Sequence, residues 1–209
     1  MILNEEKYSK FALTKEMLET ADVVRKLDVA PLVELAKDLG DLILLSGEGS
    51  SRIFPAKNAI ANAKIRGYKQ NIFTEGATQA MDYKLNDASV FVASNSGKTK
   101  EGVRLIRHLK ENGYKNLYGV VAHAGTPIIA EADGGYVLTC GNEDAVAATK
   151  SVVEQALAYE IALRTLNGVA LPDLQKLGDQ IEEVLTTSIP SEVLAPLMEA
   201  PIMYWAGKN

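Results

Sequence analysis

The sequence has 209 residues, 47% of them hydrophobic and 23% charged, which is typical of a well-packed globular protein. Its 22 Lys and Arg against 27 Asp and Glu give a formal charge of −5, so we expect no general attraction to nucleic acid or to an anionic membrane. The single cysteine, Cys140, excludes an intrachain disulfide, and the lack of a membrane-length apolar run or a signal-peptide pattern leads us to expect a cytoplasmic protein.

Residues 1–40 predict two helices that precede a sheet. One helix covers residues 5–26, and the other covers residues 31–39, with Gly40 placed to end it. Short β-rich runs then alternate with helical stretches, and these runs are residues 42–45, 71–73, 89–93, 117–122 and 135–139. Five strands separated by helical crossovers predict an α/β domain with a mostly parallel sheet.

The last part of the sequence predicts further helices and one short strand. A long helix over residues 146–166 ends near Gly168, another begins at Pro172-Asp173, and a short one runs to Glu199 with Ser191 as its N-cap. Residues 201–209 repeat the pattern of residues 41–49, an apolar strand followed by Gly. We interpret this stretch as the first strand of a second α/β module, and the alternative is an extra strand of the same domain. The predicted division is therefore 1–40, 41–168, 169–200 and 201–209.

Two Ser-rich turns each follow an apolar run and precede a helical stretch. They are residues 47–51, which end in Ser50-Ser51, and residues 94–99, which contain Ser94, Ser96 and Thr99. The hydroxyls and the free N–H groups at helix starts suit the oxygens of a phosphate monoester, and Gly97 allows close backbone approach. The alternative is that these Ser and Thr only cap helices. Two such turns at the same sheet edge favour a phosphate site.

Nucleotide and metal sites do not fit the spacing. Gly97-Lys98-Thr99 resembles the end of a P-loop, but the required upstream Gly is Val92. A dinucleotide fingerprint starting at Gly47 would need its third Gly at Arg52. His108 and His123 have no metal-like partner at suitable spacing, so we expect neither a metal nor a cofactor.

Three ordered segments resemble the sugar isomerase (SIS) domain family. Residues 94–101 look like its Ser-x-Ser-Gly-x-Thr-x-Glu/Asp phosphate loop, and Gly49-Ser50-Ser51 looks like its first Gly-x-Ser turn. Residues 141–150 are similar to a Gly-x-Glu-x-x-Val-Ala-Ser-Thr-Lys stretch in the isomerase half of glucosamine-6-phosphate synthase, with Ala148 in place of the Ser. The resemblance covers about residues 41–165 and implies a flavodoxin-like three-layer α/β/α fold.

The resemblance also implies a ligand and the residues that hold it. The ligand would be a phosphorylated sugar or amino sugar, and its phosphate would contact Ser51, Ser94, Asn95, Ser96, Gly97 and Thr99. The residues implied near the sugar are Gly49, Ser50, Val146, Ala147, Ala148 and Lys150. Because SIS domains usually pair, a homodimer or a pairing with a second SIS domain is implied.

Catalysis needs a base beside the reacting carbons, and enzymes of this family take a Glu base from a second SIS domain or a neighbouring subunit. This chain alone is therefore expected to bind a sugar phosphate without converting it. Its own candidate carboxylates are Glu48, Glu75, Glu101 and Glu143, and Glu75, after the second strand, is the favoured one of the four although a weak candidate. The expected function is the first half of a sugar-phosphate isomerase or aminotransferase-type enzyme. The alternatives are a non-enzymatic sugar-phosphate sensor and a fructosamine-6-phosphate-type deglycase.

Overall fold

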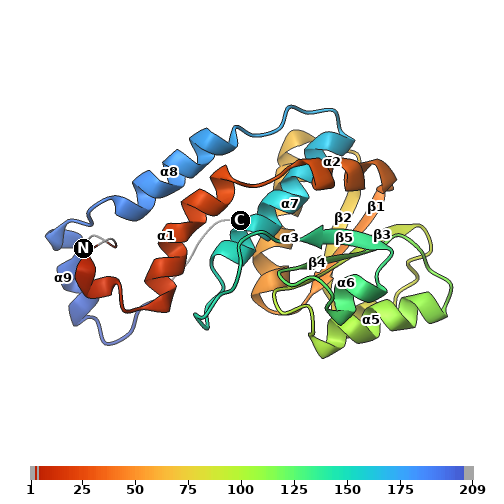
Figure 1. Cartoon of the computed structure of the whole chain (residues 1–209), viewed down its shortest axis with the longest axis horizontal. Helices are drawn as coiled ribbons and strands as arrows, with labels where there is room; N and C mark the ends of the chain where they lie inside the picture. The colour runs from red at the N-terminus through yellow and green to blue at the C-terminus, as the bar shows by residue number, and fades with distance from the viewer. Residues whose placement is uncertain (1–2, 4, 205–209) are drawn as a thin grey trace.

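A five-stranded parallel sheet forms the centre of the molecule. The computed structural model describes residue 3 and residues 5–204 (Figure 1). The strands are β1 (Leu42–Gly47), β2 (Asn71–Gly76), β3 (Ala88–Ser94), β4 (Leu117–Val121) and β5 (Gly134–Val137). They lie in the order β2-β1-β3-β4-β5, and every neighbouring pair is parallel. This order is that of flavodoxin-like folds, so the predicted fold class is confirmed.

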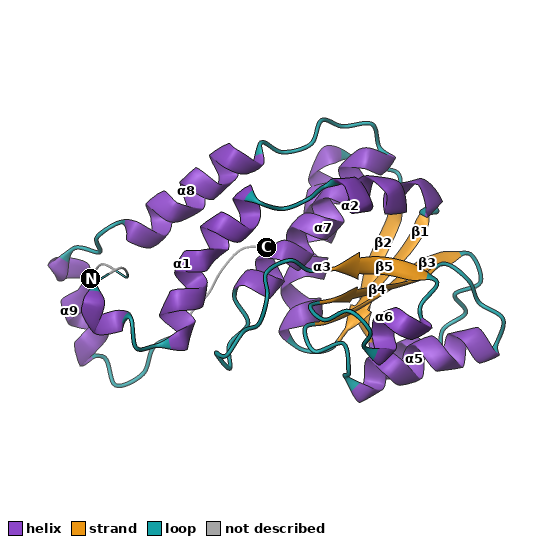
Figure 2. Cartoon of the chain, viewed as in Figure 1, coloured by secondary structure: helices purple, strands orange, loops and turns teal. Residues whose placement is uncertain are grey.

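Helices cover both faces of the sheet (Figure 2). One face carries α2 (Ala30–Leu35), α3 (Ser50–Arg66) and α7 (Lys150–Leu166), and the other carries α4 (Ala77–Ala80), α5 (Lys100–Glu111) and α6 (Pro127–Glu131). Side chains alternate along the fully buried β3, so Phe91 belongs to the first core while Val90 and Val92 belong to the second. The predicted three layers are therefore present.

The N-terminal region differs from its prediction. Instead of one helix over residues 5–26, a 3₁₀ turn, η1 (Glu6–Tyr8), precedes α1 (Ala12–Arg25). The Ser9 hydroxyl donates a hydrogen bond to the Glu6 carbonyl at 2.7 Å and competes with regular helical bonding there. The second predicted helix is α2 followed by the 3₁₀ turn η2 (Ala36–Asp38).

A helical pair projects from the sheet domain. It consists of α1 and α8 (Leu174–Thr186), which pack side by side at the left of Figure 1. Arg25 joins them through ion pairs with Asp179, at 2.8 Å, and with Glu182. As predicted, the chain enters α8 at Asp173, the N-cap residue, whose carboxylate accepts the Lys176 N–H at 3.0 Å.

The C-terminal end contains α9 (Ser191–Glu199). It starts at the predicted residue, but the N-cap position is held by Pro190, not by Ser191, since the Pro190 carbonyl accepts the first helical N–H groups. Residues 201–204 are a bend and irregular backbone. The remainder of the predicted strand at 201–209 lies outside the described residues.

Candidate functional site

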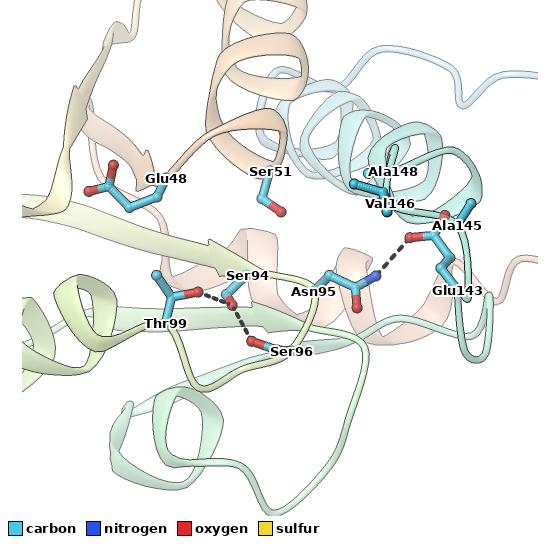
Figure 3. Close-up of a pocket in the computed structure, with 10 residues that line it drawn as sticks. All are labelled: Glu48, Ser51, Ser94, Asn95, Ser96, Thr99, Glu143, Ala145, Val146 and Ala148. Carbon is cyan, nitrogen blue, oxygen red and sulfur yellow. Dashed lines mark hydrogen bonds between the residues drawn. The ribbon is translucent and has the colours of Figure 1, made fainter. Parts of the chain in front are cut away.

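A pocket opens where the chain leaves two neighbouring strands toward opposite faces of the sheet. The helix after β1 is α3, on one face, and the helix after β3 is α5, on the other. Such a switch point is where ligands bind in doubly wound folds. The pocket has a volume of about 310 Å³ and is lined by Glu48, Ser51, Ser94, Asn95, Ser96, Thr99, Glu143, Ala145, Val146 and Ala148 (Figure 3).

Hydroxyl groups of the turn after β3 converge on this pocket. The Ser94 Oγ lies 2.8 Å from the Thr99 Oγ1 and 3.4 Å from the Ser96 Oγ. Backbone N–H groups hold the turn in shape, because Gly97 donates to the Ser94 Oγ at 3.1 Å and Lys98 donates to the Ser96 Oγ at 3.2 Å. The 12-residue helix α5 follows directly, and its N-terminal dipole favours an anion in front of it.

Gly97 shapes this turn without lining the pocket. Its φ angle is 63°, in the left-handed region that side chains disfavour. A Cβ atom there would lie 2.0 Å from the Thr126 Oγ1, and Thr126 is itself fixed by donating to the His123 carbonyl at 2.8 Å. Only glycine therefore fits this position in the observed backbone.

The turn after β1 forms the opposite wall. Ser51 lies in the first turn of α3 and faces the pocket across from Ser94 (Figure 3). Gly49, with φ 53°, and Ser50 form the turn that places Ser51, although neither is among the lining residues. Glu48 does line the pocket, and one of its carboxylate oxygens accepts the Ala77 N–H at 3.0 Å.

Glu143 joins the third predicted segment to the turn after β3, residues 94–99, which is the predicted phosphate turn. Its Oε1 accepts the Thr149 N–H and hydroxyl, both at 2.9 Å, and the Ser151 N–H at 3.2 Å. Its Oε2 accepts the Asn95 side-chain amide at 2.8 Å and the Ser151 hydroxyl. These contacts divert the backbone donors of residues 149 and 151 from helical bonding, which explains why the predicted helix over 146–166 begins only at Lys150.

Because of these contacts, the contribution of Glu143 to the stability of the fold depends on pH. Burial alone would raise the pKa of Glu143, but the hydrogen bonds from Ser151 and Thr149 outweigh burial and lower it. Since the pKa is lower in the folded protein, ionised Glu143 stabilises the fold fully at pH values above its ordinary pKa of 4.5. This stabilisation is lost as the pH falls through the pKa of Glu143 in the folded protein.

We therefore expect Glu143→Gln to lower the free energy of unfolding near neutral pH but to match the wild type in acid. Urea unfolding of both proteins at a series of pH values measures this difference. A destabilisation that stays unchanged down to the lowest pH at which both proteins still fold would contradict a stabilising role for the ionised carboxylate.

Of the other residues predicted to lie near the sugar, some line the pocket and one contacts α1 instead. Val146 is fully exposed on the loop and, like Ala148, lines the pocket, whereas Ala147 does not. Lys150 is buried and lies away from the lining residues, with its Nζ 2.7 Å from Glu19 Oε2 on α1. The sequence patterns did not indicate this partner, because Glu19 is far from Lys150 in the chain.

Glu75, the weak catalytic candidate, lies at the end of β2 but is not among the lining residues. Hydrogen bonds from the Gly76 N–H and the Tyr83 hydroxyl lower the pKa of its carboxyl group. A lowered pKa makes Glu75 a weaker base. In the part of the chain that the structure describes, no cluster of His, Cys, Asp or Glu could hold a metal ion, and no helix is long and apolar enough to span a membrane.

Comparison with known proteins identifies the family of the chain. A family model described as SIS domain matches residues 41–164, more than half of the chain. The glutamine–fructose-6-phosphate aminotransferase [isomerizing] of Aliivibrio fischeri is 30% identical over 114 residues, which cover 49% of this chain and 19% of that protein.

Solved structures share the fold at low sequence identity. The C-terminal domain of glucosamine-fructose-6-phosphate aminotransferase from Francisella tularensis superposes with a TM-score of 0.64 at 18% identity, covering 87% of this chain and 55% of that one. Glucosamine-6-phosphate deaminase from Thermotoga maritima gives a TM-score of 0.66 at 20% identity, covering 83% and 54%. This chain therefore spans about half the length of these structures and a smaller part of the curated relative. The chain belongs to the SIS domain family.

Proposed function

We propose that the pocket binds a phosphorylated sugar or amino sugar, with the phosphate held by the turn after β3 and by Ser51. The observation that carries this proposal is the convergence of Ser94, Ser96 and Thr99 hydroxyls on one pocket in front of the α5 N-terminus. The loop bearing Val146 and Ala148 closes the opposite end, where the sugar would lie.

We further propose that the chain supplies one half of an isomerase or aminotransferase-type enzyme. Both carboxylates that line the pocket already accept backbone N–H groups, Glu48 from Ala77 and Glu143 from Thr149 and Ser151. A catalytic base would then come from a second SIS domain or a second copy of the chain. Large apolar side chains exposed on α8 and α9, including Val184, Val193 and Met198, favour such a partner. Sedimentation velocity distinguishes a homodimer from a monomer.

The phosphate site is tested by Ser96→Ala. Loss of one hydrogen bond to a charged ligand should weaken sugar-phosphate binding by about 1 to 3 kcal/mol while leaving the fold intact. Isothermal titration with glucosamine-6-phosphate, fructose-6-phosphate and inorganic phosphate measures the change and ranks the ligands. Unchanged affinity in the variant would remove the phosphate site from this turn.

A further inference from the structure

The helix α1 contacts, through a buried carboxylate, the loop of residues 141–149 that precedes α7 and is called the sugar-side loop below. Glu16 is only 4% exposed, and its Oε1 accepts the backbone N–H groups of Asp144 and Ala145, the latter at 3.1 Å. Its Oε2 is buried and has no hydrogen-bond partner among the described residues. Burying a carboxylate costs free energy that an apolar side chain in the same place would avoid. The hydrogen bonds from the two loop N–H groups are therefore the interactions that offset the cost of burying Glu16.

A second carboxylate of α1 holds the far end of the same loop. Glu19, three residues along the helix, pairs with the buried Lys150 at the start of α7. Burial by itself would lower the pKa of Lys150, but the hydrogen bond from Lys150 to Glu19 and the negative charges of Glu19 and Glu16 raise it. Lys150 thus stays charged, and α1 holds the loop both at residues 144–145 and at residue 150.

The loop in turn meets the pocket at two places. Ala145 and Val146 line it directly, and Glu143 binds the side chain of Asn95 in the phosphate turn. The Glu16 contact falls on Ala145 itself, one residue before Val146. A loosened Glu16 contact would therefore displace the sugar end of the pocket first, while the phosphate turn keeps its own internal hydrogen bonds.

We propose that Glu16 is a positioning residue for the sugar moiety, holding the backbone of residues 144–145 so that the loop closes the sugar end of the pocket. The inference rests on the proposed function of the pocket. It makes the N-terminal helix a part of the binding site, although α1 contributes no lining residue.

The test compares two ligands in the full chain. Glu16→Ala should weaken glucosamine-6-phosphate binding about tenfold, the effect of roughly one lost polar contact, and leave inorganic phosphate binding unchanged. Glu16→Gln, which keeps one acceptor oxygen, should lose less. Arg25→Gln is the matched control, because it breaks the ion pairs of α1 with α8 and touches neither the loop nor the pocket. Its affinities for both ligands should equal those of the wild type.

Hydrogen exchange of the unliganded proteins supplies a readout that needs no ligand. In Glu16→Ala, the amides of Asp144 and Ala145 should exchange faster, while those of Gly97 and Lys98 should not change. If Glu16→Ala binds glucosamine-6-phosphate as tightly as the wild type, or loses the same affinity for both ligands, the positioning role is wrong and the proposed function still stands. A wild-type protein that binds neither ligand would overturn the proposed function, and exchange would then decide only whether Glu16 holds the loop.

Discussion

Gly97→Ala is expected to abolish measurable sugar-phosphate binding and to destabilise the fold by about 2 to 4 kcal/mol. Two effects combine in this estimate. A side chain at φ 63° costs about 1 to 2 kcal/mol on its own. The new Cβ would also lie 2.0 Å from the Thr126 Oγ1 and 2.7 Å from the Thr126 Cβ, so rotating the threonine hydroxyl away does not relieve the clash. The backbone of the turn must move, and the hydroxyls of Ser94 and Ser96 move with it.

The control for this prediction is Gly49→Ala in the other turn of the same site. Gly49 has a similar φ of 53°, but a Cβ there meets nothing within 4 Å. Because its ψ of −135° lies outside the left-handed helical region, its substitution should cost backbone strain of about 1 to 3 kcal/mol, without a clash, and reduce binding only modestly. Urea unfolding measures the loss of stability in each variant, and isothermal titration measures the loss of binding. Equal losses of binding in the two variants would show that the Thr126 contact does not determine the shape of the phosphate turn.

The sheet and both Ser-rich turns could be predicted because their signals are local. Apolar runs of strand length encode the buried parallel strands, and the Gly, Ser and Thr residues that follow the runs of β1 and β3 encode the turns after them within a few residues. The predicted strands β1 and β2 were too short at their ends, since Ser46, Thr74 and Glu75 are polar. Pairing across the strands continues regardless, with the Ser46 hydroxyl donating to the Glu75 carbonyl at 3.0 Å.

The sugar-side loop could not be predicted in the same way because distant carboxylates determine its backbone. The helical pattern from residue 146 is real, but Glu143 and Glu16 accept N–H groups of residues 144, 145, 149 and 151, and the helix begins at Lys150. Lys150, read from the sequence as near the sugar, pairs instead with Glu19. A single sequence holds no local sign that residues more than a hundred positions apart are in contact.

Glu154→Gln is expected to cost about 2 to 4 kcal/mol of the free energy of unfolding, although it changes one atom in the side chain. Glu154 is fully buried on α7. Its Oε1 accepts the Tyr136 hydroxyl at 2.9 Å and the Thr139 N–H at 2.7 Å, and its Oε2 accepts the Cys140 N–H at 2.8 Å. A glutamine amide would point donor hydrogens at one of these donors inside a fully buried site. The chain after β5 would then loosen where it enters the sugar-side loop.

The single cysteine provides a local readout of this loosening. Burial and the Glu154 charge raise the pKa of the Cys140 thiol to about 12, so the wild-type thiol should react slowly with alkylating reagents. In Glu154→Gln we expect the urea midpoint to fall and the reaction to accelerate, both because the thiol becomes more accessible and because the Glu154 charge that raises its pKa is gone. Unchanged labelling with a lower midpoint would mean that the stability is lost elsewhere in the fold.

A substitution at the neighbouring Gln155 tests whether lost hydrogen bonds or disturbed packing destabilises Glu154→Gln. Gln155 is as fully buried as Glu154, yet neither atom of its amide has a partner in the described part of the chain. Gln155→Met keeps the volume and removes two unsatisfied polar atoms, so it should be neutral or stabilise the protein by about 1 kcal/mol. Opposite results at adjacent positions of one helix would show that the satisfied carboxylate, and not helix packing, holds the end of β5. A matching loss in Gln155→Met would instead assign the cost of both substitutions to disturbed packing.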